Sequence, residues 1–220
     1  MSKLRVHNFS LSLDGYAAGP DQSLDNPLGV GGGGLHEWMF ATRSFRRMHG
    51  LDGGDEQGLD DEFAAQGEVG IGATIMGRNM FGPVRGPWGD ADWKGWWGDN
   101  PPFHHPVFVL THHPRASITM QGGTTFHFVS DGIEAALERA VEAAEGHDVR
   151  LGGGAATVQQ YLRARLIDEL HLAIVPILLG RGERLFDHLG DGPVGYSVEF
   201  ACSPAVVHAC LLRAPGGSAA

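Results

Sequence analysis

Apolar residues along this chain occur in short runs and in helical repeats. The short runs lie at 4–13, 69–76, 106–110, 126–129, 149–151 and 170–176, and each predicts a strand. In the first run Phe9, Leu11 and Leu13 alternate onto one face. We expect helices over 35–48, 59–66, 133–145 and 155–166, with Ser130 and Asp131 as the N-cap of the third. Runs at 194–201 and 205–212 predict a closing antiparallel hairpin.

The stretch from 149 to 186 reads as strand, glycine turn, helix and strand, which is the order of a βαβ crossover. Gly152, Gly153 and Gly154 let the backbone turn tightly and let a ligand approach without a Cβ in the way. The helix from Ala155 would point unpaired N–H groups at the same space, as phosphate sites do. A tight βα turn without a ligand explains the glycines equally well. The spacing G-x-G-x-x-G of a Rossmann domain is absent from this stretch.

A second strand–glycine–helix turn follows the run at 69–76, in the sequence Gly77 to Gly82. It includes Arg78, whose planar guanidinium can bind a phosphate through two parallel hydrogen bonds. A surface ion pair is the alternative use of this arginine. Two such turns, one of them with an arginine, suit the two ends of a dinucleotide better than either turn alone.

Two loops at strand ends supply further candidate side chains. Asp14 and Gly15 follow the first strand, and their turn either aims Asp14 or Tyr16 into a pocket or is merely capped by the carboxylate. The run at 106–110 ends where open α/β sheets place their ligands. The residues there that could meet a phosphate or stack on a purine are Thr111, His112 and Arg115.

The chain has 220 residues, of which 16 are basic and 26 acidic, so its net charge is −10. This length predicts a single domain, 1–220, with a glycine-rich insertion at about 21–66. The negative charge argues against a nucleic acid or an anionic membrane as the partner. No apolar run reaches the roughly 20 residues of a membrane helix, and residues 1–10 lack an apolar signal core, so we expect a cytoplasmic protein.

Three other groups of residues have plain interpretations. The histidine pairs at 104–105 and 112–113 have no spaced cysteine or carboxylate partners, so we expect no metal site. The tryptophans of 83–102 should pack onto the domain or a partner subunit, a stacking platform for a sugar or base being the alternative. Cys202 and Cys210 are too few for a disulfide framework, and we expect two reduced, buried thiols unless their strands pair and bridge them.

Four blocks carry a resemblance to a known family, in the family's order. They are Ser12-Leu13-Asp14-Gly15-Tyr16, Met76-Gly77-Arg78, Gly152-Gly153-Gly154, and the stretch from Asp168 to Phe186. With them the sequence resembles the dihydrofolate reductase-like family, and within it the branch similar to the reductase domain of bacterial riboflavin biosynthesis. The resemblance implies a three-layer α/β fold: a mainly parallel twisted sheet flanked by helices, with an antiparallel C-terminal hairpin. It also suggests a homodimer.

The resemblance further implies an NADPH site. The diphosphate would lie against Gly152, Gly153, Gly154 and Ala155, with Thr157 nearby. The adenosine side would be formed by Gly77, Arg78, Asn79, Met80, Thr111 and His112. The nicotinamide would be bordered by the loop from Asp14 to Ala18, which includes Gly15 and Ala17. Met80 stands where the family usually has Thr or Ser, so only backbone N–H donors remain at that position.

The chemistry expected from these residues is reduction. Hydride would pass from NADPH to a C=N or C=O bond of a small, heterocyclic, pteridine- or pyrimidine-like substrate, while the protein supplies orientation and electrostatics. The proton donors we consider are Asp14 and Glu37, the latter being the nearest counterpart of the acidic residue of the folate enzymes. A non-catalytic nucleotide-binding protein that keeps the fold is the alternative, and an interaction role through the tryptophan-rich segment is a third possibility.

Overall fold

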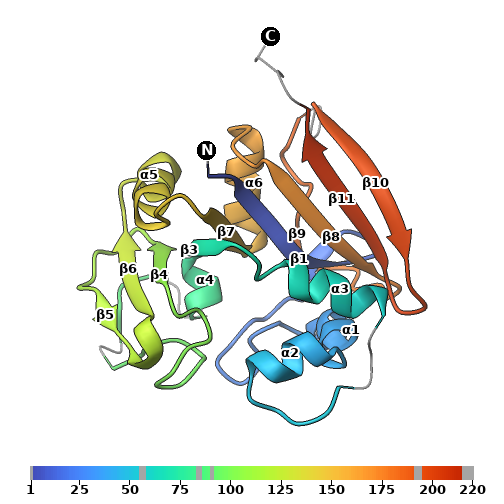
Figure 1. The fold of residues 1–220 in the computed structure, drawn as a ribbon, viewed down its shortest axis with the longest axis horizontal. Coiled ribbons are helices and arrows are strands. Elements are labelled where there is room, and N and C mark those ends of the chain that lie inside the picture. Colours follow the sequence, from blue (N-terminus) through green and yellow to red (C-terminus); the bar gives the residue numbers. More distant parts are fainter. Residues whose placement is uncertain (1, 55–57, 83–85, 90–91, 191–194, 215–220) are drawn as a thin grey trace.

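The computed structural model describes residues 2–54, 58–82, 86–89, 92–190 and 195–214. Within them a nine-stranded sheet has the order β10-β11-β8-β1-β7-β3-β4-β6-β5 (Figure 1). Its strands are β1 (Leu4–Ser12), β3 (Ile71–Gly77), β4 (Pro106–Leu110), β5 (Ile118–Thr119), β6 (Thr125–Val129), β7 (Asp148–Gly153), β8 (Glu169–Val175), β10 (Tyr196–Cys202) and β11 (Val207–Arg213). The strands from β8 to β6 in this order pair in parallel. The closing strands β10 and β11 form the predicted antiparallel hairpin, and β11 joins it to β8.

Alternation along β8 shows how the sheet is covered on both faces. Leu170 and Leu172 belong to the largest apolar cluster, which includes the buried faces of α5 and α6. Ala173 and Val175 point the other way, into a cluster with Leu35 and Trp38 of the insertion. The helical segments are η1 (Gly32–His36), α1 (Glu37–Phe40), α2 (Arg43–Met48), α3 (Leu59–Gln66), α4 (Arg78–Phe81), η2 (Gln121–Gly123), α5 (Ile133–Ala143) and α6 (Ala155–Arg163). The predicted three-layer α/β fold is therefore confirmed.

The structure corrects three local predictions. The helix expected over 35–48 is broken into η1, α1 and α2, because the side chain of Thr42 accepts a hydrogen bond from the backbone N–H of Phe45 and caps a new helix. The N-cap of α5 is Gly132, with no side-chain cap, and Asp131 instead binds Arg139. Leu13 is 61% exposed, because β1 ends one residue earlier.

Three short strands were not foreseen: β5 (Ile118–Thr119) at the edge of the nine-stranded sheet, and two that pair with each other. β2 (Tyr16–Ala18) and β9 (Glu183–Arg184) form a separate antiparallel pair that joins the loop after β1 to the loop after β8. Their lengths of three and two residues are too short to give a hydrophobic pattern. The predicted range 194–201 begins at Val194, which lies outside the described residues.

The tryptophan-rich segment packs onto the domain, as predicted. Trp88, Trp93 and Trp97 contact a buried cluster that includes Met76 and Phe126, although 83–85 and 90–91 lie outside the described residues. Cys202 and Cys210 are both free thiols, but Cys202 is exposed and Cys210 half-buried, so the expectation of two buried thiols was wrong. They do not face each other across the hairpin, since Cys202 pairs with Val207.

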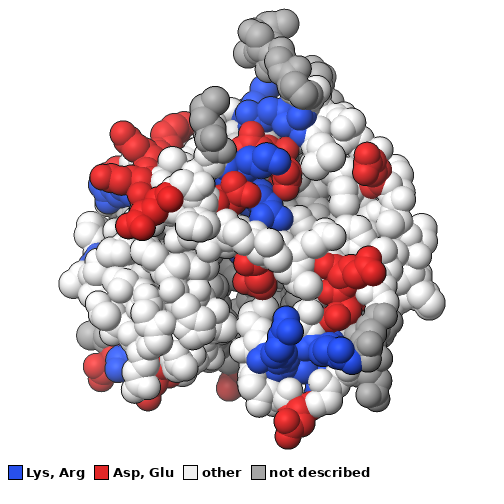
Figure 2. All heavy atoms as spheres, viewed as in Figure 1, with Lys and Arg blue, Asp and Glu red and all other residues white. Residues whose placement is uncertain are grey.

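Charged side chains are distributed unevenly over the surface. On the face in Figure 2, acidic side chains gather over α5 and basic ones over α2. The α2 helix includes Arg43, Arg46 and Arg47, and the guanidinium of Arg46 binds the backbone carbonyl of Asp52. These arginines therefore belong to the outer surface of the insertion.

Candidate functional site

One cavity of about 560 Å³ opens at the carboxyl ends of β1, β3, β4, β6 and β7. Ligands bind at this edge in open α/β sheets. Most of the site residues expected from the sequence line it: Ala17, Gly77, Arg78, Asn79, Met80, Thr111, His112, Gly152, Gly153, Gly154, Ala155 and Thr157. Gly15, Asp14 and Glu37 are not among the lining residues.

The two glycine turns serve different purposes in the cavity wall. A Cβ at Gly77 would lie 2.3 Å from the Thr157 hydroxyl, so this glycine lets β3 and α6 approach each other. A Cβ at Gly154 would meet nothing within 4 Å. Since Gly154 lines the cavity, this open space is available to a ligand. Gly153 has φ of 126°, which only glycine adopts readily, and faces the ring of Phe9.

The α6 helix begins at the cavity with no side chain over its end. Its N-cap is Gly154, which makes no side-chain hydrogen bond, and Ala155 is the first helical residue. The first backbone N–H groups of a helix have no intrahelical partner, and the dipole adds partial positive charge there. This end of the cavity is therefore suited to an anionic group.

Arg78 adds a charged side chain whose guanidinium group stacks on the ring of Trp88. Its guanidinium carbon lies 3.4 Å from the centroid of Trp88, and that of Arg115 lies 4.8 Å from the same ring. Burial, and secondarily the charge of Arg115, lower the pKa of Arg78. The Nε of Arg78 is buried without a hydrogen-bond partner, although another of its nitrogens donates to the carbonyl of Gly82. Two guanidinium groups in this environment favour an anion between or beside them.

The loop after β4 is fixed by its own hydrogen bonds. The backbone N–H of Thr111 donates to Val129, and the Thr111 hydroxyl accepts from the backbone N–H of His113. The carbonyl of His113 in turn accepts from the indole of Trp88. The loop that includes His112 is therefore hydrogen-bonded to Trp88, the ring on which the guanidinium of Arg78 stacks.

Asp14 holds a turn outside the cavity. Its carboxylate accepts hydrogen bonds from the Ser12 hydroxyl and from the backbone N–H groups of Leu179 and Gly180. These bonds, that from Ser12 foremost, lower the pKa of Asp14 to about 2. The carboxyl group is therefore ionised at neutral pH, which does not favour the role of proton donor. Gly15, with φ of 84°, completes the tight turn.

The second acidic candidate is also not among the residues that line the cavity. Glu37 is exposed and lies in the first turn of α1. Its neighbour His36, however, lines the cavity, and the Nδ1 of that imidazole is buried without a hydrogen-bond partner. Burial lowers the pKa of His36 to about 4, so the ring is neutral at physiological pH.

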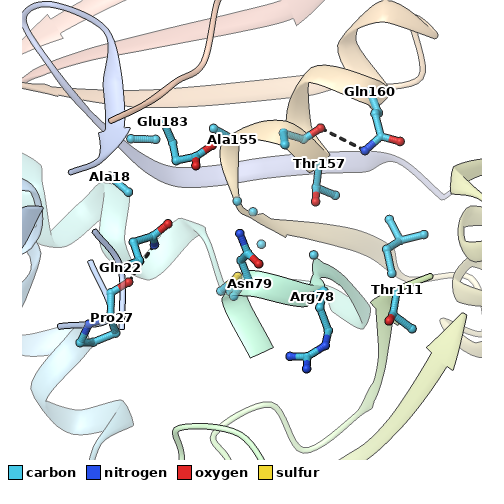
Figure 3. A pocket seen from close by; sticks show the side chains of 18 of the residues that line it. Ala18, Gln22, Pro27, Arg78, Asn79, Thr111, Ala155, Thr157, Gln160 and Glu183 are labelled. Carbon is cyan, nitrogen blue, oxygen red and sulfur yellow. Dashed lines mark hydrogen bonds between the residues drawn. The ribbon is translucent and has the colours of Figure 1, made fainter. Parts of the chain in front are cut away.

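The insertion forms the wall of the cavity opposite Thr111. Figure 3 shows Gln22 and Pro27 at one end and Thr111 at the other, with Arg78 and Asn79 between them. The amide of Gln22 donates to the carbonyl of Pro27, which fixes this part of the loop.

Sequence reasoning missed much of the lining. The missed residues are Asn8, Phe9, Ser10, Gln22, Pro27, Leu28, His36, Gly86, Trp96, Leu110, His113, Val129, Ser130, Gly132, Ile133, Ala156, Gln160 and Glu183. Ser130 to Ile133 follow β6 and begin α5, so the strand–turn–helix rule used for the two glycine turns could have found them. The insertion residues have no such signal, because their sequence does not determine how the loop folds back.

The described residues contain neither a cluster of metal ligands nor a membrane-spanning helix. No group of three or more His, Cys, Asp or Glu side chains among them has the arrangement to hold a metal ion. None of their helices has the length and apolar character needed to cross a membrane.

Comparisons with known proteins give a consistent fold. A protein assigned to riboflavin biosynthesis from Shewanella sp. PV-4 is 23% identical, with a TM-score of 0.55 over 98% of this chain and 100% of that one. A diaminohydroxyphosphoribosylaminopyrimidine deaminase/5-amino-6-(5-phosphoribosylamino)uracil reductase from Thermotoga maritima is 12% identical, with a TM-score of 0.52, and is matched over 97% of this chain but 57% of its own length. Dihydrofolate reductase from Enterococcus faecalis, complexed with NADP(H) and RAB-propyl, is 12% identical with a TM-score of 0.52 over 96% of each chain. No curated protein matches.

The model of one protein family matches residues 5–200. This range contains every residue that lines the cavity, from Asn8 to Glu183. It also contains the four sequence blocks that carried the resemblance. The chain therefore belongs to the RibD C-terminal domain family.

Proposed function

We propose that this chain is an NADPH-dependent reductase of a small heterocycle, pteridine- or pyrimidine-like, at a C=N or C=O bond. The observation that supports it most is one cavity that joins an open glycine turn, an uncapped helix end and a stacked arginine. Membership of the RibD C-terminal domain family supports reductase chemistry. One fold neighbour is described as a 5-amino-6-(5-phosphoribosylamino)uracil reductase, and this compound is the first substrate to test.

The residues present fit NADPH. The space beside Gly154 would take the diphosphate, which the end of α6 would bind through backbone N–H groups at Ala155. The buried, unpaired Nε of Arg78 is a donor that lacks an acceptor. A 2′-phosphate would supply that acceptor, with Arg115 adding charge. The lining residues Asn79, Met80 and Thr157 would complete this side.

Bound here, the nicotinamide supplies the hydride. The chain's residues hold the reacting partners and exclude water. At the end formed by the insertion, Gln22, His36 and Glu183 are the polar side chains of the lining that can bind a heterocycle. Asp14 would hold the turn that borders this end in place, through its hydrogen bonds to Leu179 and Gly180. We propose that His36 helps to bind the heterocycle, because its neutral imidazole has a buried nitrogen without a hydrogen-bond partner.

A non-catalytic nucleotide-binding protein is the second candidate. It is favoured by Met80, which offers no hydroxyl, and by the absence of Asp14 and Glu37 from the cavity lining. NADPH binding without oxidation by any compound of a pteridine and pyrimidine panel would support this candidate over the reductase.

We also propose a homodimer. Among the described residues, β10 is the outermost strand at its side of the sheet, and Phe200 on it is 68% exposed. An apolar edge strand is a surface that proteins usually cover. Analytical ultracentrifugation measures the mass directly, and a monomer at micromolar concentration would contradict the proposal.

The first experiment is a fluorescence titration with NADPH and, separately, NADH. Arg78→Ala should weaken NADPH binding at least about tenfold and NADH binding less than about twofold, because one charge-assisted phosphate contact is worth this much. Arg139→Ala, on an exposed arginine paired with Asp131, is the matched control and should change neither. Equal losses for both cofactors would remove the phosphate role of Arg78, and no binding to the wild-type protein would end the reductase proposal.

A further inference from the structure

The floor of the cavity begins at an irregularity in β1. Val6 pairs with Leu170 and Phe9 with Leu172, so His7 and Asn8 together stand opposite the single residue His171. This is a β-bulge, and Asn8 has φ of 56°, which is uncommon for a residue with a side chain. Bulges of this kind often aim residues at functional sites.

A chain of buried side chains holds the bulge from behind. The backbone N–H of Asn8 donates to Nδ1 of His171 at 3.1 Å. Nε2 of His171 lies 2.9 Å from Nδ1 of His208, and Nε2 of His208 lies 2.8 Å from a carboxylate oxygen of Asp60. These residues come from β1, β8, β11 and α3, and Figure 1 shows α3 lying beside β1.

The donor at one end fixes the direction of every bond. A backbone N–H can only donate, so Nδ1 of His171 must be unprotonated and its Nε2 carries the hydrogen. Nδ1 of His208 then accepts, and its Nε2–H donates to Asp60. Each imidazole is neutral and held in one tautomer. Any other arrangement places two hydrogens or two lone pairs against each other.

The surroundings keep water out of this chain. Asp60 and His171 are each 1% exposed and His208 is 0% exposed. The ring of Phe63 stacks on both imidazoles, with centroids 4.5 and 4.0 Å away. Burial lowers the pKa of both His171 and His208, in keeping with neutral rings.

The same strand segment lines the cavity. Asn8, Phe9 and Ser10 are lining residues, and the hydroxyl of Ser10 accepts a hydrogen bond from the indole of Trp38 at 2.9 Å. Trp38 also meets His208 edge to face. The insertion therefore contacts Ser10 directly through Trp38 and is connected to Asn8 through Asp60, His208 and His171.

We propose that Asp60, His208 and His171 form a positioning relay that sets the backbone of Asn8 to Ser10 under the substrate heterocycle. The role rests on the proposed reductase function. The relay acts through the strand and does not touch substrate or cofactor. It makes substrate affinity depend on a helix of the insertion, whereas Arg78 and Thr111 at the NADPH end are held by hydrogen bonds to Gly82 and Val129, outside the relay.

An apolar core would be the simpler way to attach α3 to the sheet. Burying a carboxylate and two imidazoles costs desolvation energy, and apolar replacements of such groups are often more stable. What apolar contacts lack is direction, whereas this chain of hydrogen bonds specifies one arrangement, even though Oδ2 of Asp60 is buried without a hydrogen-bond partner. The bulge at Asn8 needs an acceptor at one place, and the relay supplies it.

The test compares two substitutions of Asp60 that differ in whether an oxygen remains to accept the hydrogen bond from His208. Asp60→Leu removes the acceptor, whereas Asp60→Asn keeps an oxygen there. Amide hydrogen exchange in the ligand-free protein is followed by NMR at Asn8, Ser10 and, as a control at the other end, Thr111. Asp60→Leu should accelerate exchange at Asn8 at least about tenfold and leave Thr111 within about twofold, while Asp60→Asn stays close to wild type. Equal acceleration at all three sites, or no difference between the two variants, would overturn the relay.

Two further readouts keep the test decisive. The imidazole ¹⁵N spectrum of the wild-type protein should show His171 protonated at Nε2 and unprotonated at Nδ1; the opposite tautomer would overturn the relay even if the variants do not fold. With 5-amino-6-(5-phosphoribosylamino)uracil as the probe substrate, Asp60→Leu should raise KM at least about fivefold while the Kd of NADPH changes less than about twofold. Failure of wild-type NADPH binding would count against the proposed function, whereas the exchange and tautomer results judge the relay alone.

Discussion

At the Thr111 end of the cavity the walls are turns that directly follow strands, whereas at the Gln22 end they are loops of the insertion folded back from a distance. Gly77 is the last residue of β3 and Gly154 directly follows β7, so the sheet itself determines their positions. The η1 segment that ends at His36 contacts β1 and β2, and its Leu35 packs on β8, while Gln22 is held by the carbonyl of Pro27. The first end is a property of the fold, and the second is where this chain can differ in what it binds.

The largest effect we expect is a loss of stability on acidification, which arises mainly from buried histidines on the insertion side. Burial lowers the pKa of His7, His36 and His105 to about 4 and that of His171 to about 2, and all of them except His105 lie on the insertion side. The unfolded state takes up these protons near pH 6.5, whereas the folded state does not, so stability falls as pH drops below about 6.5. We expect a loss on the order of 1 kcal/mol per pH unit for each such histidine.

Urea unfolding between about pH 7 and about pH 5 measures this slope, above the range where carboxylates titrate. His7→Phe should reduce the slope, since it removes one proton-binding group whose Nδ1 is buried without a partner. His49→Phe, on an exposed ring, is the matched control. A flat stability across this range would show that the buried histidines take up protons in the folded state.

Gly77→Ala should disrupt the NADPH end with a smaller total effect. The new Cβ lies 2.3 Å from the Thr157 hydroxyl, and the backbone at Gly77 has φ of −77°, so the clash is the only obstacle. Overpacking of this kind costs about 1 to 3 kcal/mol and should also weaken NADPH binding. Thermal unfolding with the double variant Gly77→Ala/Thr157→Ala tests the cause, because removing the hydroxyl should restore much of the stability. If the double variant is no more stable than Gly77→Ala, the clash with the Thr157 hydroxyl is not the cause of the destabilisation.

Gly29→Ala should affect only the insertion end. A Cβ at Gly29 would lie 2.2 Å from the carbonyl oxygen of Gly19, and φ is 73°, so the loop that carries Gln22 and Leu28 must shift. For 5-amino-6-(5-phosphoribosylamino)uracil we expect KM to rise about tenfold, or ~1.4 kcal/mol, with the Kd of NADPH unchanged. Gly33→Ala, where a Cβ meets nothing within 4 Å, is the control. A comparable loss of NADPH affinity would show that the two ends are not independent.

The same division decides what the sequence could reveal. The strands and the glycine turns were predictable because short apolar runs and Gly–helix junctions are local features, and Gly77, Arg78 and Gly152 to Ala155 do line one cavity. The break at Thr42 was also local, and a Thr before Arg-Ser-Phe is a capping signal that the apolar spacing concealed.

Other features depend on partners far away along the chain. The carboxylate of Asp14 is bound by backbone groups of Leu179 and Gly180, more than 160 positions later. Asp60 meets His208 across 148 positions. No spacing rule connects such residues, so the sequence placed Asp14 at a possible pocket and gave His171 no role.

The position of β1 in the sheet has a consequence for how the protein is made. Its partners are β7 and β8, with Leu4 beside Val149 and Arg5 beside Glu169. A ribosome adding 5 to 20 residues per second needs roughly 10 to 30 s to reach them after β1 has been synthesised. For that interval Leu4 and Val6, later fully buried, have no strand beside them. During that interval the unpaired backbone groups of β1 can pair with another chain, which makes the β1 segment the aggregation risk of the nascent protein.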